Sequence, residues 1–163
     1  MKKMVALVAA GLVLSGGVAF AGTSSSGIVF HPIPGSATPG SPASGLPLSE
    51  SAGVDDVLYL SGQIGNAQPG TPVVAGGIPA EAKQAMDNVK AALANRGLTT
   101  ADVFKCDVFI TDMTQLGNVN SVYATYFAPG RLPARSAVGV SALTLGAHVE
   151  VECTAAFGGH GRH

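Results

Sequence analysis

The sequence predicts an α/β domain in which two helices cover one face of a mixed β-sheet. Segments that alternate apolar and polar residues and segments with helical spacing of apolar residues follow one another along the chain. Their order is β, short β, α, β, α, β, β, which favours a helix layer on a mixed sheet. Each helical segment also carries a single apolar stripe, so each helix has one face to bury against the sheet.

The chain begins with features of a secretory signal peptide. Two lysines follow the first methionine, an apolar run extends to about Leu14, and Ala19-Phe20-Ala21 supplies the small residues of a cleavage site. This pattern predicts a signal peptide over 1–21. The apolar run is shorter than the roughly 20 residues that a membrane span needs. We therefore expect an exported protein, periplasmic or secreted, that does not remain in the membrane after cleavage.

The next segment, 22–46, is rich in Ser, Gly and Pro, which predicts a flexible tether or an extended edge segment. The folded domain is expected over 47–158, followed by a short tail at 159–163. No internal repeat divides this domain.

The first half of the domain contains strand, turn and helix signals in that order. The run DVLYLS (56–61) predicts a strand that Gly62 ends. A turn-rich stretch with a short strand at 73–74 follows. Pro79 then begins a helix that ends at Gly97, as expected for a proline in the first turn and a glycine at the C-cap.

The second half repeats the alternation of strand and helix. The run VFKCDVFIT (103–111) predicts a strand, and 114–127 predicts a helix that Pro129 and Gly130 stop. The segments at 135–140 and 147–157 predict two further strands. Because both helices are expected on one face, the other sheet face is uncovered, and an exposed apolar face indicates self-association.

Composition and charge narrow the classes of partner. The chain has 9 basic and 10 acidic residues, a formal net charge of −1, and signal cleavage would remove two of its lysines. A weakly acidic domain lacks the positive footprint of a nucleic-acid-binding protein. The four histidines have no metal-type spacing, so no metal site is predicted.

Two cysteines, Cys106 and Cys153, lie inside predicted strands. An oxidising compartment would permit a disulfide, but pairing depends on which strands are neighbours, and the sequence does not show that. We favour two small buried thiols over a disulfide.

Three charged residues are the main candidates for chemistry. Arg135 opens a strand, where its guanidinium either binds a carboxylate ligand or forms a structural ion pair. Glu150 and Glu152 lie two apart on one strand and point to one face. Two neighbouring carboxylates raise each other's pKa unless a cation is near, and Arg135 is the candidate cation. A solvated strand face and a water-activating carboxylate both remain open.

Two further features have a structural and a functional interpretation. Ser61-Gly62-Gln63 ends the first strand, where glycine either makes an ordinary turn or lets a ligand approach the backbone. Asn120 lies in the middle of the second helix, where its side chain either caps a loop or binds a ligand.

Six segments, in this order and spacing, resemble the RidA (YjgF) family over about residues 46–157. They are LYLSGQIG (58–65), NVKAAL (88–93), DVFKCDVFITDM (102–113), NVNSVYATYF (118–127), PARSAVGV (133–140) and HVEVECTA (148–155). The resemblance implies a chorismate-mutase-like fold, with a mixed sheet backed by two helices. It also implies a homotrimer with a barrel-like core of three sheets and active sites between subunits.

The resemblance further implies hydrolysis of reactive enamines and imines, of the 2-iminobutanoate/2-iminopropanoate type, to a 2-oxo acid and ammonia, with no cofactor. By its motifs, Arg135 binds the substrate carboxylate, and Glu150 positions the attacking water. Ser61 and Gly62 line the pocket, and Asn120 contributes to it.

Two positions depart from the pattern of the family. Leu48 stands where many deaminases of the family have tyrosine, and Ala137 stands where many have cysteine. Because Leu48 makes one wall of the substrate pocket more apolar, we expect a shifted substrate range. The alternative is a non-catalytic trimer that binds a small carboxylate or protects other proteins.

Overall fold

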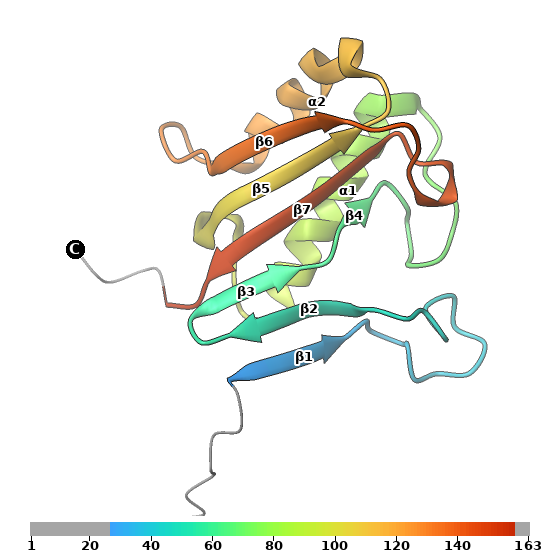
Figure 1. Ribbon diagram of the computed structural model, residues 1–163, viewed down its shortest axis with the longest axis vertical. Helices are drawn as coiled ribbons and strands as arrows, with labels where there is room; N and C mark the ends of the chain where they lie inside the picture. The colour runs from blue at the N-terminus through green and yellow to red at the C-terminus, as the bar shows by residue number, and fades with distance from the viewer. Residues whose placement is uncertain (1–26, 159–163) are drawn as a thin grey trace, which may run out of the picture.

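The computed structural model describes residues 27–158 (Figure 1). The predicted signal peptide, the first residues of the 22–46 segment and the tail at 159–163 lie outside this range. Within it, no helix combines the length and apolarity that crossing a membrane requires.

One seven-stranded sheet forms the scaffold (Figure 1). Its main order is β1-β2-β3-β7-β5-β6, with β4 pairing to β7 as well. Only β5 and β6 pair in parallel among the described strands, so the sheet is mixed, as predicted. The strands are β1 (Ile28–Pro32), β2 (Ser49–Val54), β3 (Val57–Leu60), β4 (Gln63–Ile64), β5 (Val103–Ile110), β6 (Ala134–Gly139) and β7 (Val149–Ala156).

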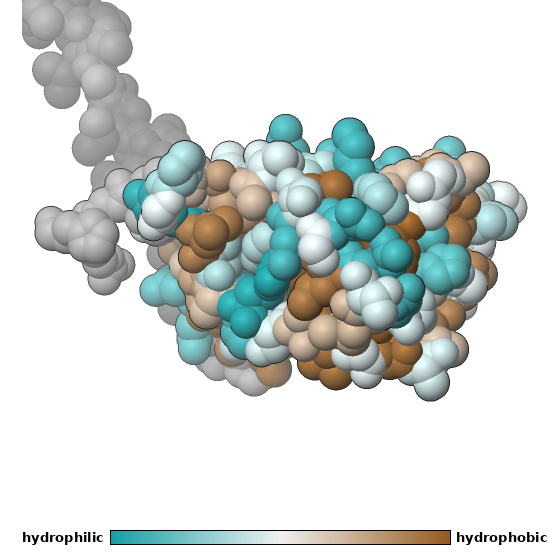
Figure 2. Space-filling model, turned by 90° about the horizontal axis from the view of Figure 1, so that it is seen from above, coloured by the Kyte–Doolittle hydropathy of each residue, from teal (hydrophilic) through white to brown (hydrophobic). Residues whose placement is uncertain are grey.

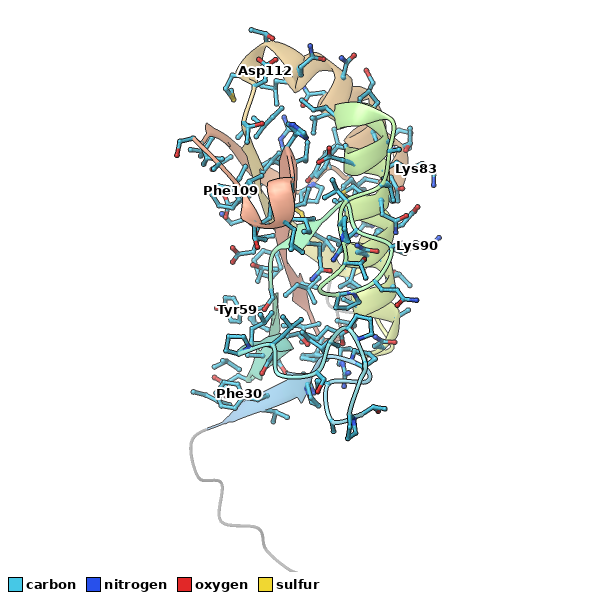
Figure 3. All side chains as sticks on the ribbon, turned by 90° about the vertical axis from the view of Figure 1, so that its right-hand side faces the viewer. Phe30, Tyr59, Lys83, Lys90, Phe109 and Asp112 are labelled. Carbon is cyan, nitrogen blue, oxygen red and sulfur yellow. A yellow bond between two sulfur atoms is a disulfide. The ribbon has the colours of Figure 1, made fainter. Side chains whose placement is uncertain are left out.

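Two α-helices, α1 (Gly77–Ala94) and α2 (Leu116–Tyr123), cover one face of this sheet. The core lies between the helix layer and the sheet. Its fully buried side chains come from α1 and the central strands and include Met86, Leu93, Val108 and Val149. In side view, Phe30, Tyr59 and Phe109 project from the side of the sheet opposite α1 (Figure 3). The predicted fold class, a mixed sheet with two helices, is therefore confirmed.

Several predicted boundaries shift. The predicted strand at 56–61 is β3, and its partner β2 has no sequence signal because SESAGV contains little of the β-branched alternation typical of a strand. The short strand at 73–74 is a single bridge between Asn66 and Val73. The second helix is shorter than predicted, because the turns that flank α2 are 3₁₀.

The described part of the 22–46 segment is an edge strand followed by turns. Residues of β1 pair with β2 in antiparallel register, and backbone hydrogen bonds close successive turns from Ile33 onward. Ile33 and Ala43 are buried against the domain. This arrangement matches an extended edge segment, the second of the two alternatives that the composition left open, and the folded unit therefore begins before residue 47.

The expectation of two unpaired cysteines is wrong. Strands β5 and β7 are neighbours, and their register places Cys106 opposite Cys153 with 4.1 Å between the Cα atoms. The two sulfurs form a disulfide inside the core. The sequence could not reveal this pair, because it depends on the register of strands 47 residues apart.

Candidate functional site

Arg135 projects toward the helix layer. The parallel register of β5 and β6 places it opposite Cys106, whose side chain is in the core beneath the helices. Its guanidinium carbon lies 4.9 Å from the ring centroid of Tyr123 on α2, a cation–π contact. Burial raises the pKa of Tyr123 to about 12, while the charge of Arg135 acts in the opposite direction. Among the described residues no carboxylate pairs with Arg135, so its fork of donors is available to a ligand.

Glu150 projects from the opposite face. Along β7 the buried residues alternate with Glu150 and Glu152, which confirms that both glutamates share the face not covered by the helices. Burial raises the pKa of the Glu150 carboxyl above its ordinary value, and the negative charge of Glu152 raises it further. A glutamate with a raised pKa is a stronger proton acceptor when ionised, as a general base requires.

Gly62 lies against this carboxylate. The chain leaves β3 at Ser61 and enters β4, where Ile64 pairs with Glu150. A Cβ at residue 62 would lie 1.8 Å from Oε1 of Glu150, so only glycine allows this approach. The Ser61 hydroxyl donates a hydrogen bond of 2.7 Å to the carbonyl of Ser49, and this bond joins the β3–β4 connection to β2.

A cavity of about 380 Å³ opens beside the β3–β4 connection. It lies between α1, the β3–β4 connection and the segment that precedes β2, and Leu48, Ser61 and Gly62 line it. The structure therefore brings Leu48, Ser61, Gly62 and Glu150 together, and we call these four residues the glutamate half-site.

The other predicted residues belong to a second group. Ala137 pairs with Val108 and packs toward the core, on the same side as Arg135. Asn120 is exposed on α2, the helix that carries Tyr123. We call Asn120, Arg135 and Ala137 the arginine half-site.

Within one subunit, the two half-sites lie on opposite faces of the sheet. The interpretation that Arg135 is the cation beside Glu150 and Glu152 is therefore wrong for a single subunit, since the charge acting on Glu150 is that of Glu152. Strand periodicity predicted the faces within β7, but the relative face of Arg135 required the register of β5 with β6. Within 27–158 no three His, Cys, Asp or Glu residues are grouped to hold a metal ion.

One buried charge was not predicted from the sequence. Glu81, in the first turns of α1, is only 2% exposed. One of its oxygens accepts the backbone N–H of His148 and the other contacts His148 Nδ1, both at 2.7 Å. Gly65 packs directly on the backbone of Glu81. The Glu81–His148 contact holds the chain just before β7, two residues before Glu150. No local sequence pattern indicates this contact.

Together, the fold and the half-sites define a class of small α+β proteins in which an arginine and a glutamate project from opposite faces of one sheet. A family model described as endoribonuclease L-PSP matches residues 38–157. The chain belongs to this family, which is the RidA (YjgF) family that its motifs predict.

Named relatives agree with this assignment. The 2-iminobutanoate/2-iminopropanoate deaminase of Mus musculus is 42% identical over 112 residues, which cover 69% of this chain and 82% of the relative. Among solved structures, the yeast protein YEO7 has a TM-score of 0.69 at 33% identity and covers 80% of this chain and 98% of its own. RidA from an Antarctic Psychrobacter has a TM-score of 0.64 at 33% identity, covering 72% and 94%.

Proposed function

We propose that this protein is an exported homotrimeric deaminase that hydrolyses reactive enamines and imines to 2-oxo acids and ammonia. The observation that carries the proposal is the Glu150 carboxylate, held against Gly62 with a raised pKa, together with Arg135, which has no carboxylate partner within residues 27–158. The deaminase named among the relatives supports the same chemistry.

The reaction follows from these two groups. Arg135 binds the substrate carboxylate and fixes the position of the C=N carbon. The imine nitrogen enters already protonated, and Glu150 accepts a proton from a water molecule as the water oxygen adds to that carbon, giving a neutral carbinolamine. Glu150 then gives this proton to the amine nitrogen and accepts the hydroxyl proton as the carbonyl forms and the C–N bond breaks. The products are the 2-oxo acid and ammonia, which takes the last proton from Glu150 and leaves as ammonium. The chemistry needs no redox step and no cofactor.

A complete site in this proposal requires two subunits, because Arg135 and Glu150 lie on opposite faces. The uncovered sheet face gives the surface for assembly, with Phe30 and Tyr59 exposed on it. Viewed from above, apolar patches lie between hydrophilic residues on the described surface (Figure 2). Association of three sheets would bury the apolar face, as in a closed cyclic oligomer.

Export is supported by two features of the chain. The pattern of residues 1–21 is that of a signal peptide. The Cys106–Cys153 disulfide is of a kind that persists in oxidising compartments. The substrate would then be an imine formed outside the cytoplasm, such as the products of amine or amino-acid oxidases.

Ammonia release tests the proposal. Imino acids generated in situ by an amino-acid oxidase should lose ammonia faster with the protein than without it. Arg135→Ala and Glu150→Gln should each lower this acceleration at least about 100-fold. Arg131→Ala, an exposed arginine in the loop before β6, is the matched control and should retain activity. Spontaneous rates with folded wild-type protein would contradict the proposal.

A second candidate is a non-catalytic binding protein, favoured by Leu48 and Ala137, where the family pattern is not followed. It predicts that a 2-oxo acid raises the melting temperature in an Arg135-dependent way without any imine turnover. The family description also names endoribonuclease activity, but a formal net charge of −1 gives no general attraction for RNA phosphates, so imine chemistry is the better supported function.

A further inference from the structure

We infer that the cavity beside Gly62 is a subsite for the substrate side chain, and that the preferred substrates are 2-imino acids with branched or aromatic apolar side chains. The inference rests on the proposed function and names its substrate class. A small imine such as 2-iminopropanoate has only a methyl group to place there, whereas a cavity of about 380 Å³ is within the range of ligand pockets.

The wall of the cavity is mainly apolar, and most of its apolar side chains outside the β4 region come from three separate parts of the chain. The N-terminal segment contributes leucines and an isoleucine, α1 contributes alanines, and the loop before β7 contributes one leucine. These residues are Ile33, Leu46, Leu48, Ala91, Ala92 and Leu145. Such a wall favours burial of a hydrocarbon side chain, because removing apolar surface from water is favourable.

Most of the polar side chains in the wall are already bonded within the protein. Asn88 donates to the carbonyls of Ile64 and Asn66, and Asn66 donates to the carbonyl of Gln68. Glu50 is the charged residue of the described wall, and its carboxylate accepts from Asn95 at 2.8 Å and from Arg96 at 3.3 Å. A polar or charged ligand side chain would therefore compete with existing bonds.

Leucines at the mouth give a second, independent observation. Leu48 is 49% exposed and Leu145 is 48% exposed, although both are large apolar residues. Leu145 also has a φ of 55°, a left-handed conformation that is strained for a residue with a Cβ. A strained backbone that presents an exposed leucine to a cavity indicates a functional contact.

The cavity lies next to the residue that contacts Glu150. Gly62 lines it on one side and touches the Glu150 carboxylate on the other. The proposal places the C=N carbon at Glu150 and the substrate side chain beyond Gly62 in the cavity, while the arginine half-site of a second subunit holds the substrate carboxylate.

The test compares imines of different size. Imino acids are formed in situ from alanine, leucine and phenylalanine, and kcat/KM is measured for each with the wild-type protein. The imines of leucine and phenylalanine should be preferred over that of alanine by at least about tenfold, the discrimination that methylenes in an apolar pocket provide. Ala91→Phe fills the cavity from α1 and should lower the ratio of phenylalanine-imine to alanine-imine activity about tenfold.

The matched control is Ala94→Phe, which places the same side chain at an exposed position of the same helix outside the cavity, and it should leave the ratio unchanged. A flat wild-type profile, or an equal loss on all imines in Ala91→Phe, would overturn the subsite. A change of oligomeric state in Ala91→Phe without a change in the ratio would assign the cavity to subunit contact instead. Absence of turnover on every imine would contradict the proposed function itself, so the two failures are distinguishable.

Discussion

The backbone of Gly62 and the carboxylate of Glu150 are in direct contact, at a distance that leaves no room for a Cβ. The contact joins two features that the sequence presents about 90 residues apart, the end of β3 and the start of β7. It holds the Glu150 carboxylate against a residue that lines a cavity, although strand alternation alone would leave Glu150 on an open sheet face. In the proposed mechanism the glycine is therefore part of the catalytic geometry, because it decides where the carboxylate can lie.

Gly62→Ala should reduce deaminase activity about 100-fold, the order of loss expected when a reacting group is displaced by about 1 Å. The φ of Gly62 is not in the left-handed region, so the backbone itself accepts alanine and the effect isolates the contact with Glu150. Ammonia release gives the measurement. Gly53→Ala in β2, where a Cβ would meet nothing closer than 3.6 Å, is the control. Equal activity of Gly62→Ala and wild type would contradict the contact.

The pH dependence of kcat/KM should respond to Glu152. Glu150 must be ionised to accept a proton, so activity falls as the pH drops through its pKa, which burial and the charge of Glu152 both raise. Glu152→Gln removes one of these causes, lowers the pKa of Glu150, and should move the acidic limb of the profile to lower pH.

Asp56→Asn removes an equal charge from an exposed turn and serves as the control for net charge. An acidic limb that stays in place in Glu152→Gln, or that moves equally in both variants, would show that the group controlling this limb is not Glu150.

Local patterns predicted much of the fold and assigned each candidate residue to an element, but not the relations between elements. Period-two alternation placed Glu150 and Glu152 on one face, because that property belongs to a single strand. The opposite face of Arg135 depends on how β6 pairs with β5, and the disulfide depends on how β5 pairs with β7. The Glu81–His148 contact joins a helix start to a strand start and leaves no periodic signal. Strand β2 was missed because tertiary pairing, and not propensity, makes it a strand.

Loss of the Cys106–Cys153 disulfide should lower the free energy of unfolding by about 2–4 kcal/mol, since the bridge closes a long loop in the unfolded chain. The double variant Cys106→Ala/Cys153→Ala should nevertheless keep most of its activity, because both sulfurs face the core and Glu150 faces the other side. Denaturant unfolding with and without a reducing agent measures the effect, and reduced wild type should approach the variant. Free thiols in unreduced, denatured wild-type protein would contradict the disulfide.

In the proposed trimer each active site takes Arg135 from one subunit and Glu150 from another, and mixed trimers test this arrangement. Arg135→Ala and Glu150→Gln homotrimers should each be inactive, because each lacks one group in every site. When equal amounts of the two variants are unfolded together and refolded, subunits assemble at random into cyclic trimers. About a quarter of the interfaces then have both intact groups, so about a quarter of wild-type activity should return.

The two variants carry different affinity tags, and tandem purification followed by mass measurement establishes that mixed trimers have formed. Mixing without refolding controls for simple addition of residual rates. Opposite sheet faces leave no route for Arg135 and Glu150 of one subunit to reach the same substrate, which is why the proposal combines two subunits in each site. Mixed trimers that form but stay inactive would contradict this shared site.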